Sequence, residues 1–329
     1  MTAPVRIGLI GAGRWGRVYL RNLDALAGRA QLTHLCTSRA DAADLVGPRV
    51  EVVREWAALV DGPCDAVIIA TPPHTHAPIL EHCLRARKPC IVEKPLCLDV
   101  ATADRLDDAV RASGVAVLVD HTHLFHPAYA ALKHALRQGG EPIRVVISEG
   151  MAMGPFRSHT TALWDWGPHD VSLCLDLLGA SPVRIAALPG PGSQGAGAEL
   201  ISIRLDWSEG ASAWIHTGRL SPQKRRNLTV ITDRHLYQLD DVPTSSLTVA
   251  NIELESRYAG GLPETLERRL IPFDDRPPLA CMLERFVDGI TGQRLDGFGT
   301  ALGRDVVRVI AECERELTRR GPAAATRAA

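Results

Sequence analysis

The sequence predicts an α/β protein with two domains that differ in the type of sheet they contain. Up to about residue 120, short apolar strands alternate with helices, which is typical of a doubly wound parallel sheet with right-handed crossovers. Beyond that point several strands follow one another without intervening helices, and their apolar and polar residues alternate as in a half-buried antiparallel sheet. We place the domains at residues 1–122 and 123–320 and expect a disordered tail at 321–329.

Composition restricts the classes of partner. The 329 residues include 37 basic and 38 acidic side chains without a long run of one sign, so we expect neither nucleic acid nor an anionic membrane as a partner. No apolar run approaches the roughly 20 residues of a membrane span, and the first strand begins too early for a signal peptide. Eight scattered cysteines form no C-x-x-C pair, which indicates reduced thiols in a cytoplasmic protein and no metal site.

The parallel half is predicted from its apolar runs and the residues that interrupt them. Residues 65–70 form the clearest buried strand, and a helix over 100–113 is expected to end at Gly114, which suits a C-cap. The other elements expected here are strands over 5–10, 31–36, 51–53, 90–92 and 115–119, and helices over 40–45, 56–60 and 76–87.

The second half shows the period of two that antiparallel strands require. Ile143, Val145 and Ile147 are expected to face inward, and inward Ile201 and Ile203 alternate with polar neighbours. The other elements expected here are strands over 212–219, 227–232 and 246–255, and helices over 279–291 and 301–320.

The segment Gly11-Ala12-Gly13-Arg14-Trp15-Gly16 follows a buried strand and precedes a helix, the context in which G-x-G-x-x-G binds a dinucleotide. The first glycine permits a tight turn, the second lets the main chain approach a pyrophosphate, and the third lets the helix pack on the strand. The N–H groups at the helix start then face the phosphates. Candidate cofactor-binding residues are Gly11, Gly13, Arg14, Trp15 and Gly16; the alternative is a glycine-rich turn that binds nothing.

Two further loops follow strands, and ligands of doubly wound sheets lie beyond the carboxyl ends of the strands. The first, Thr71-Pro72-Pro73-His74-Thr75-His76, offers Thr71, Pro72, His74 and His76 as cofactor-binding candidates; alternatively it is a proline-stiffened turn whose histidines are capping or surface residues. The second, Glu93-Lys94-Pro95, offers Glu93 and Lys94. A lysine here can hydrogen-bond a substrate hydroxyl beside a nicotinamide, whereas the alternative is a solvated Glu–Lys pair.

A third segment, Trp164-Asp165-Trp166-Gly167-Pro168-His169-Asp170, precedes an apolar stretch. Pro168 suits the first turn of a helix and Gly179 its end. Asp165 and His169 are four residues apart, so in a helix they share a face. A histidine near a carboxylate is a plausible general base. The alternative is that Asp165 caps the helix and His169 hydrogen-bonds a carbonyl.

These motifs occur in the order found in the glucose–fructose oxidoreductase / inositol dehydrogenase (Gfo/Idh/MocA) family, which the chain resembles over essentially its whole length. The resemblance implies a Rossmann domain followed by an α/β domain on a large open, mostly antiparallel sheet. It also implies that Lys94, Asp165 and His169 meet above the nicotinamide and act on a secondary alcohol of a sugar or cyclitol. Because all three residues match, we expect a working enzyme, although the fold also hosts non-catalytic cofactor-binding regulators.

Local features narrow the substrate. Trp15 in the glycine turn, the segment 119–125 and the residues around Asp165 resemble family members that oxidise nucleotide-linked sugars. The arginine common in the family's segment is absent from residues 119–126, where this chain has histidines and leucine. The candidates for substrate binding are His121, His123, His126 and Trp166.

The end of the second strand bears on the choice of cofactor. An acid there binds the ribose hydroxyls of NAD, whereas arginine or serine accepts the 2′-phosphate of NADP. This chain has Thr37-Ser38-Arg39, and we expect the nearest acid, Asp41, to lie beyond reach. Ser38 and Arg39 are therefore cofactor-binding candidates, and NADP(H) is favoured over NAD(H). Arg39 is alternatively a solvated residue at a helix start.

The sequence thus predicts an NAD(P)-dependent oxidoreductase that moves hydride between a nicotinamide and a secondary alcohol or ketone of a sugar. His169 would exchange the hydroxyl proton, Asp165 would orient the substrate, and Lys94 would hydrogen-bond the reacting oxygen or act as the base. One alternative is an NADPH-dependent reductase of a keto-sugar, cyclitol or imine intermediate in secondary metabolism. An open sheet with one apolar face favours a homodimer or homotetramer.

Overall fold

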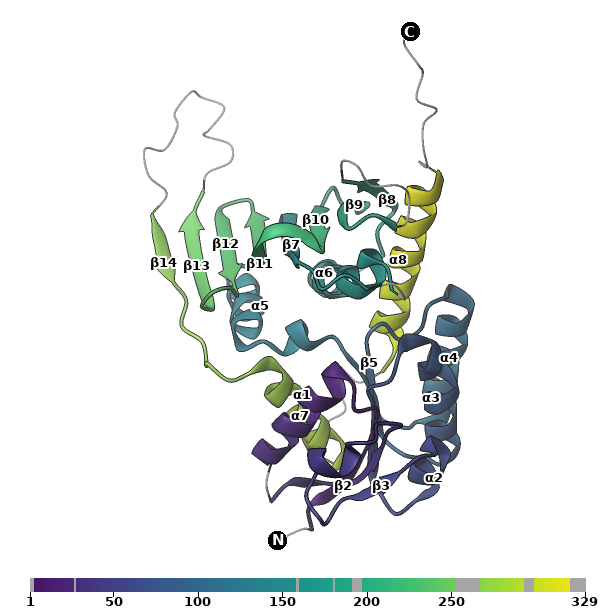
Figure 1. Cartoon of the computed structure of the whole chain (residues 1–329). Helices are drawn as coiled ribbons and strands as arrows, with labels where there is room; N and C mark the ends of the chain where they lie inside the picture. The colour runs from purple at the N-terminus through teal and green to yellow at the C-terminus, as the bar shows by residue number, and fades with distance from the viewer. Residues whose placement is uncertain are drawn as a thin grey trace, which may run out of the picture. The chain divides into compact units, whose positions relative to one another are not determined.

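The computed structural model of the chain divides into two compact units, which we describe separately (Figure 1). Unit 1 comprises Met1–Phe125 and Arg276–Val307, and unit 2 comprises His126–Asp275 and Arg308–Ala329. Unit 1 thus includes a late segment that a boundary at residue 122 assigns to the second domain. The structure describes residues 3–26, 28–157, 160–179, 181–190, 197–252, 267–292 and 299–319, so the expected tail at 321–329 and the end of the strand expected over 246–255 lie outside the described residues.

Unit 1 contains the expected doubly wound sheet. Its six strands are all parallel, in the order β3-β2-β1-β4-β5-β6, and the order reverses between β1 and β4, where such sheets bind their ligands. The strands are β1 (Val5–Ile10), β2 (Ala30–Cys36), β3 (Glu51–Val53), β4 (Ala66–Ile69), β5 (Cys90–Glu93) and β6 (Val117–Asp120). The helices between them are α1 (Arg14–Leu23), α2 (Trp56–Asp61), α3 (His76–Arg85) and α4 (Val100–Ser113).

The core of unit 1 combines the start of the chain with a helix from near its end. Helix α7 (Pro278–Ile290) places Met282, Leu283 and Phe286 in one buried cluster with apolar residues of β1, β4 and α1. Helix α4 is capped at both ends, and the C-cap at Gly114 confirms the prediction. Asp99 accepts a hydrogen bond from the Thr102 N–H at 2.8 Å, and Gly114 ends the helix with φ 64°, a left-handed conformation that favours glycine.

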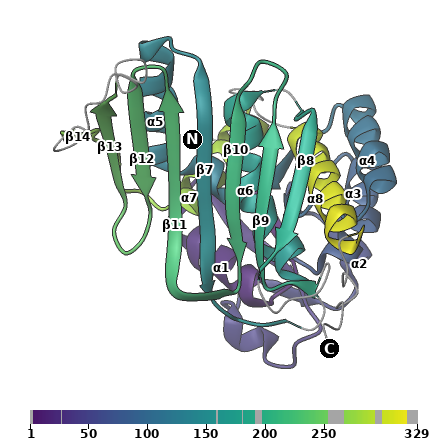
Figure 2. The same cartoon turned by 90° about the horizontal axis from the view of Figure 1, so that it is seen from above.

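Unit 2 is built on eight strands in the order β14-β13-β12-β11-β7-β10-β9-β8. All pairs are antiparallel except β7 with β10. Figure 2 shows helices α5 (Pro127–Gly139) and α6 (Ala162–Leu178) behind this sheet. The strands are β7 (Ile143–Met153), β8 (Arg184–Pro189), β9 (Leu200–Asp206), β10 (Ser212–Gly218), β11 (Leu220–Thr232), β12 (His235–Asp240), β13 (Ser246–Asn251) and β14 (Arg268–Leu270). Helix α8 (Ala301–Arg319) contributes residues to both units.

The prediction that Ile143, Val145 and Ile147 of β7 face inward is wrong. Val146, Ser148 and Gly150 are the buried positions, whereas Val145 and Ile147 are half-exposed on the other face. The period of two is correct, but apolar side chains occur on both faces and the covered face includes a serine, so the pattern alone pointed to the wrong side. In β9 the prediction is confirmed, because Ile201 and Ile203 are buried.

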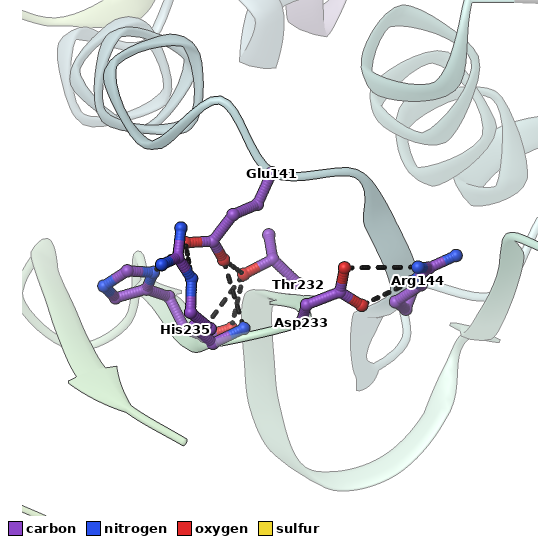
Figure 3. Close-up of polar contacts among 6 residues, drawn as sticks. Glu141, Arg144, Thr232, Asp233 and His235 are labelled. Carbon is purple, nitrogen blue, oxygen red and sulfur yellow. Dashed lines mark hydrogen bonds and ion pairs between the residues drawn. The ribbon is translucent and has the colours of Figure 1, made fainter. Parts of the chain in front are cut away.

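A polar cluster joins the turn between β11 and β12 to the start of β7 (Figure 3). The Glu141 carboxylate accepts hydrogen bonds from the Thr232 hydroxyl, from the main chain and side chain of Arg234, and from His235 at 2.8 Å. Burial acts to raise the pKa of Glu141, but these donors outweigh it and hold the pKa below its usual value. The cluster therefore fixes this end of the sheet around an ionised carboxylate.

Among the described residues, no helix has an apolar stretch of the length needed to cross a membrane.

Candidate active site

The glycine turn between β1 and α1 has the geometry of a phosphate cradle. Gly11 has φ 100°, and a Cβ there would lie 2.5 Å from the carbonyl oxygen of Ala70, so only glycine fits. A Cβ on Gly16 would lie 2.0 Å from the Gly11 oxygen, because the helix packs directly on the turn. A Cβ on Gly13 would meet nothing within 4 Å, and no side chain caps the start of α1. The open space and uncapped N–H groups fit a pyrophosphate.

Arg14 and Trp15 lie in the first turn of α1 beside this cradle. Arg14 is exposed and Trp15 is half-buried. Both side chains are therefore at least partly accessible to solvent, and their contact with a cofactor stays a prediction.

The loop after β2 carries the residues expected to select the cofactor. Ser38 and Arg39 are exposed, and the Arg39 guanidinium binds both carboxylate oxygens of Asp41, at 2.7 and 2.6 Å. The hydrogen bonds from Arg39, followed by the charges of Arg39 and Arg17, hold the pKa of Asp41 below its usual value. The Arg54 guanidinium stabilises this loop by donating hydrogen bonds to the carbonyl oxygens of residues 37 and 39.

The loop after β4 separates its two histidines. His74 is exposed, whereas His76 is fully buried and its ring nitrogens lie 2.9 Å from the carbonyl oxygens of Thr71 and Pro95. Burial lowers the pKa of His76, and a neutral imidazole can donate to only one of the two carbonyls. With both ring nitrogens against the main chain, His76 braces this loop to the Lys94-Pro95 turn, which favours the structural alternative for this residue. Thr71 and Pro72 remain at the accessible edge.

Lys94 lies in a buried polar cluster at the carboxyl edge of the same sheet. Its side chain is only 8% exposed, and Glu93 and Asp120 beside it are 5% and 1% exposed. The Tyr19 hydroxyl on α1 donates to Asp120 Oδ2. The alternative of a solvated Glu–Lys pair is therefore wrong. We did not foresee Tyr19 and Asp120; the available signal was that two neighbouring apolar strands both end in an acid.

His121 follows Asp120 and is also buried. Among the described residues, neither of its ring nitrogens has a hydrogen-bond partner. Burial, and then the charge of Lys94, lower the pKa of His121 to about 4, so the imidazole is neutral at physiological pH. Buried polar atoms normally have a partner. An unsatisfied imidazole therefore suits a residue that binds a ligand. His123 lies half-buried in the short helical turn Thr122–Phe125 that follows.

In unit 2, helix α6 carries the remaining candidates but begins earlier than expected. Thr161 is the N-cap and accepts from the Trp164 N–H, so Pro168 lies inside the helix and not in its first turn. Asp165 is consequently not the capping residue. It lies one turn before His169, and both are half-buried together with Trp166 while the opposite side of the helix is covered. The expected common face of Asp165 and His169 is confirmed.

Two arginines contact side chains on this accessible side of α6. Arg157 pairs with Asp165 at 3.1 Å, and the Arg226 guanidinium lies 5.8 Å from the centre of the Trp166 ring. His126, the other histidine considered for substrate, instead caps α5 by accepting from the Ala128 N–H.

Asp170 anchors α6 to the sheet and was not recognised as a positioning residue. Its fully buried carboxylate accepts from the hydroxyls of Ser148 on β7 and Thr217 on β10, and from Arg226 on β11 at 2.8 Å. A Cβ on Gly150 would lie 2.4 Å from this carboxylate, which explains the glycine. Three strands thus fix the rotation of the helix that presents Asp165 and His169. The signal in the sequence was a charged residue directly before an apolar helical stretch.

Replacing Asp170 by alanine is expected to lower the free energy of unfolding by about 3–5 kcal/mol, because the substitution leaves the Arg226 charge buried without its partner. The matched control is Asp233→Ala, which removes the exposed ion pair with Arg144 and should leave the free energy of unfolding nearly unchanged. Urea denaturation followed by tryptophan fluorescence measures both values. Equal losses for the two variants would contradict the anchoring role.

The known proteins to which this chain is similar are oxidoreductases. Residues 5–121 match a family model described as an oxidoreductase family with an NAD-binding Rossmann fold. Inositol 2-dehydrogenase 2 of Paenarthrobacter aurescens is 34% identical over 192 residues, which are 55% of this chain and 57% of that relative. UDP-N-acetylglucosamine 3-dehydrogenase of Acidithiobacillus ferrooxidans is 26% identical over 88% of this chain and 90% of the relative. The chain therefore spans little more than half of the first relative and most of the second.

The fold has close counterparts among solved structures. A crystal structure of a protein from Magnetospirillum magnetotacticum superposes with a TM-score of 0.84 at 36% identity, covering 94% of this chain and all of that one. The structure of the Acidithiobacillus ferrooxidans enzyme gives a TM-score of 0.83 at 23% identity, a likeness of fold alone. The chain thus combines a Rossmann fold in unit 1 with a mostly antiparallel sheet in unit 2, as the sequence predicts.

Proposed function

Because the chain belongs to the Gfo/Idh/MocA family of NAD-binding oxidoreductases, we propose that it moves hydride between a nicotinamide and a secondary alcohol or ketone of a nucleotide-linked sugar. The observation that carries the proposal is the buried Lys94 at the same sheet edge as the open glycine cradle. A buried lysine beside a cofactor cradle is well suited to stabilise charge on a reacting oxygen.

We assign the reaction's proton and charge handling to three residues. A nicotinamide dinucleotide, when bound at the glycine turn, supplies the hydride acceptor or donor. In oxidation the substrate carbon loses hydride, the hydroxyl oxygen loses its proton, and a carbonyl is left. His169 takes the hydroxyl proton, Lys94 donates a hydrogen bond to the oxygen, and Asp165 orients the sugar. Reduction reverses each transfer.

Lys94→Ala and His169→Asn are each expected to lower kcat by about 100-fold or more, because each removes a group that acts on the reacting oxygen or its proton. The matched controls are Lys133→Ala and His134→Asn on α5, which should leave turnover within about twofold of the unsubstituted chain. Steady-state kinetics compares the test variants with the controls, and circular dichroism checks that each variant is folded. Unchanged turnover in both test variants would overturn the assignment.

NADP(H) is the cofactor we propose. The exposed Arg39–Asp41 ion pair contributes little to stability, so a 2′-phosphate can compete for the guanidinium at small cost. Arg17 acts electrostatically on the same carboxylate and adds positive charge nearby. Ser38 offers a hydroxyl beside them. NAD(H) would instead require Asp41 to bind the ribose hydroxyls.

Arg39→Ala is expected to weaken NADPH binding about tenfold or more and to leave NADH binding unchanged, because only the 2′-phosphate uses the guanidinium. Arg6→Ala is the control, since it removes another exposed arginine, which binds both oxygens of Asp65 at the opposite end of the sheet. Fluorescence titration of each reduced cofactor gives the Kd. A larger loss for NADH would favour Asp41 as a ribose ligand and NAD(H) as the cofactor.

Two observations favour a nucleotide sugar over a free cyclitol. The nucleotide-sugar relative matches 90% of its length, whereas the match to the inositol enzyme covers 57%. The unsatisfied His121 imidazole offers a neutral donor and acceptor near Lys94, which suits a hydroxyl or amide of a sugar. His123 and Trp166 remain proposed substrate contacts. A keto-sugar reductase uses the same residues in reverse.

With NADP(H) saturating, the melting temperature is expected to rise with UDP- or dTDP-sugars and not with free cyclitols, because only a ligand of the native state stabilises it. A rise with cyclitols alone would transfer the assignment to the inositol side. If the melting temperature rises but no sugar or cyclitol tested leads to oxidation or reduction of the cofactor, the result would support a cofactor-binding regulator. Thermal unfolding measures the stabilisation, and absorbance assays of the cofactor measure turnover.

A homo-oligomer remains our proposal for the assembly. The face of the eight-stranded sheet opposite α6 carries Ile147 and its register partner Trp214, which is 42% exposed, together with Leu188, which is 50% exposed. Arg204 stacks on Trp214 at 4.8 Å. This partly apolar face supports packing of one copy against another.

A further inference from the structure

Two acids lie side by side at the carboxyl edge of the unit 1 sheet, and the proposed reaction gives neither of them a role. Glu93 is the last residue of β5 and Asp120 the last of β6, and the two are direct register partners. Register partners in neighbouring strands direct their side chains to the same face of the sheet. Both side chains are more than nine-tenths buried. Two carboxyl groups therefore share one solvent-excluded site.

The hydrogen bonds around the two acids are unequal. Asp120 accepts at both oxygens, from the Tyr19 hydroxyl at Oδ2 and from the Thr122 hydroxyl at Oδ1. In contrast, Glu93 Oε1 is buried and has no hydrogen-bond partner among the described residues. Donors stabilise a carboxylate, whereas a buried carboxylate oxygen without a donor is costly. Asp120 thus suits the ionised form and Glu93 the protonated form.

The pKa shifts of the two acids agree with a protonated Glu93 and an ionised Asp120. Burial, and then the Asp120 carboxyl, raise the pKa of Glu93 well above its usual value. Burial also raises the pKa of Asp120, but hydrogen bonds from Thr122 and Tyr19 act in the opposite direction. Two like charges in contact at low dielectric cannot both ionise at neutral pH.

The groups that face the acids come from three elements. Tyr19 on α1 stays neutral because burial and Asp120 raise its pKa well above the usual value. His121 after β6 is neutral above pH of about 4, the value to which burial and Lys94 lower its pKa. Lys94, directly after β5, acts on both acids as a positive charge. Of the described groups around the acids, Lys94 is thus the cation.

We propose that Glu93 and Asp120 hold one proton between them, carried by Glu93, and form a positioning pair that presents a single negative charge to Lys94. That charge keeps Lys94 in the ammonium form. The inference deepens the proposed function and rests on it only for the consequence in catalysis, because the charge of the pair is a property of the free protein.

The test is the titration of Lys94 by NMR, in the cofactor-free chain with 13Cε-labelled lysine. The chain has four lysines, Lys88, Lys94, Lys133 and Lys224, and the spectrum of Lys94→Arg identifies the Lys94 signal. In Glu93→Gln or Asp120→Asn the remaining acid loses its carboxyl neighbour and ionises, so one negative charge persists. Each single variant should therefore shift the Lys94 titration by less than about 0.5 pH unit, whereas the double variant should lower it by about 1–3 units.

The alternatives give different patterns. If both acids were ionised, each single variant would remove a charge and lower the Lys94 titration by itself. If both were neutral, the double variant would leave it unchanged. Either result overturns the proposal. Asp107→Asn serves as the control, because it alters another buried acid of unit 1, bound to Thr300 and Arg304, and should leave Lys94 unaffected.

A second measurement does not need the double variant to fold. Infrared spectra of the unsubstituted chain at neutral pH should contain the carbonyl band of a protonated carboxylic acid, and each single variant should lack it. A band that persists in Glu93→Gln would contradict the shared proton. Neither the NMR titration nor the infrared spectrum uses substrate, so a negative result would contradict the acid pair without contradicting the proposed reaction. In the active enzyme, the double variant alone should move the Lys94-dependent limb of the kcat/KM pH profile to lower pH.

Discussion

The contact between Gly11 and the carbonyl of Ala70 is the constraint on which unit 1 depends. Only a residue without a side chain can take φ 100° with the main chain of β4 so close. The contact joins the ends of β1 and β4 at the point where the strand order reverses. Because all six strands are parallel, the loops after β4, β5 and β6 then open at one edge. Lys94 and Asp120 therefore lie near the cradle as a consequence of topology, not of local sequence.

In unit 2 a buried charge fulfils the corresponding role. Helix α6 is amphipathic only in part, and apolar packing by itself allows a helix to rotate or slide on a sheet. The Asp170 carboxylate binds three different strands, and each hydrogen bond is directional, so the helix has one rotation at which all are formed. Asp165 and His169 depend on that rotation for their accessible position. A buried positioning residue thus determines which side of α6 stays accessible.

Most of the fold was predictable from the sequence because its signals are local. An apolar run, a glycine in a turn and a residue that caps a helix each depend on neighbours in the chain, and strands such as β1 and helices such as α4 lie where they were expected. Signals that depend on distant partners were missed. The N-cap of α6 at Thr161 was missed because Pro168 suits the first turn of a helix. In the structure Pro168 instead lies inside this long, packed helix. Helix α5 and strand β12 were not recognised at all.

The proposed charge of the buried acids favours one of the two roles considered for Lys94. Apolar side chains at positions 93 and 120 would serve the fold at lower cost, so the acids are better explained by their effect on the lysine. With one proton on the pair, neutral Tyr19 and neutral His121, the ammonium charge of Lys94 is balanced and the cluster as a whole is neutral. Loss of the Lys94 proton would leave a buried negative charge without a counterion, which is unfavourable. We therefore propose that Lys94 acts as a hydrogen-bond donor and that His169 takes the hydroxyl proton of the substrate.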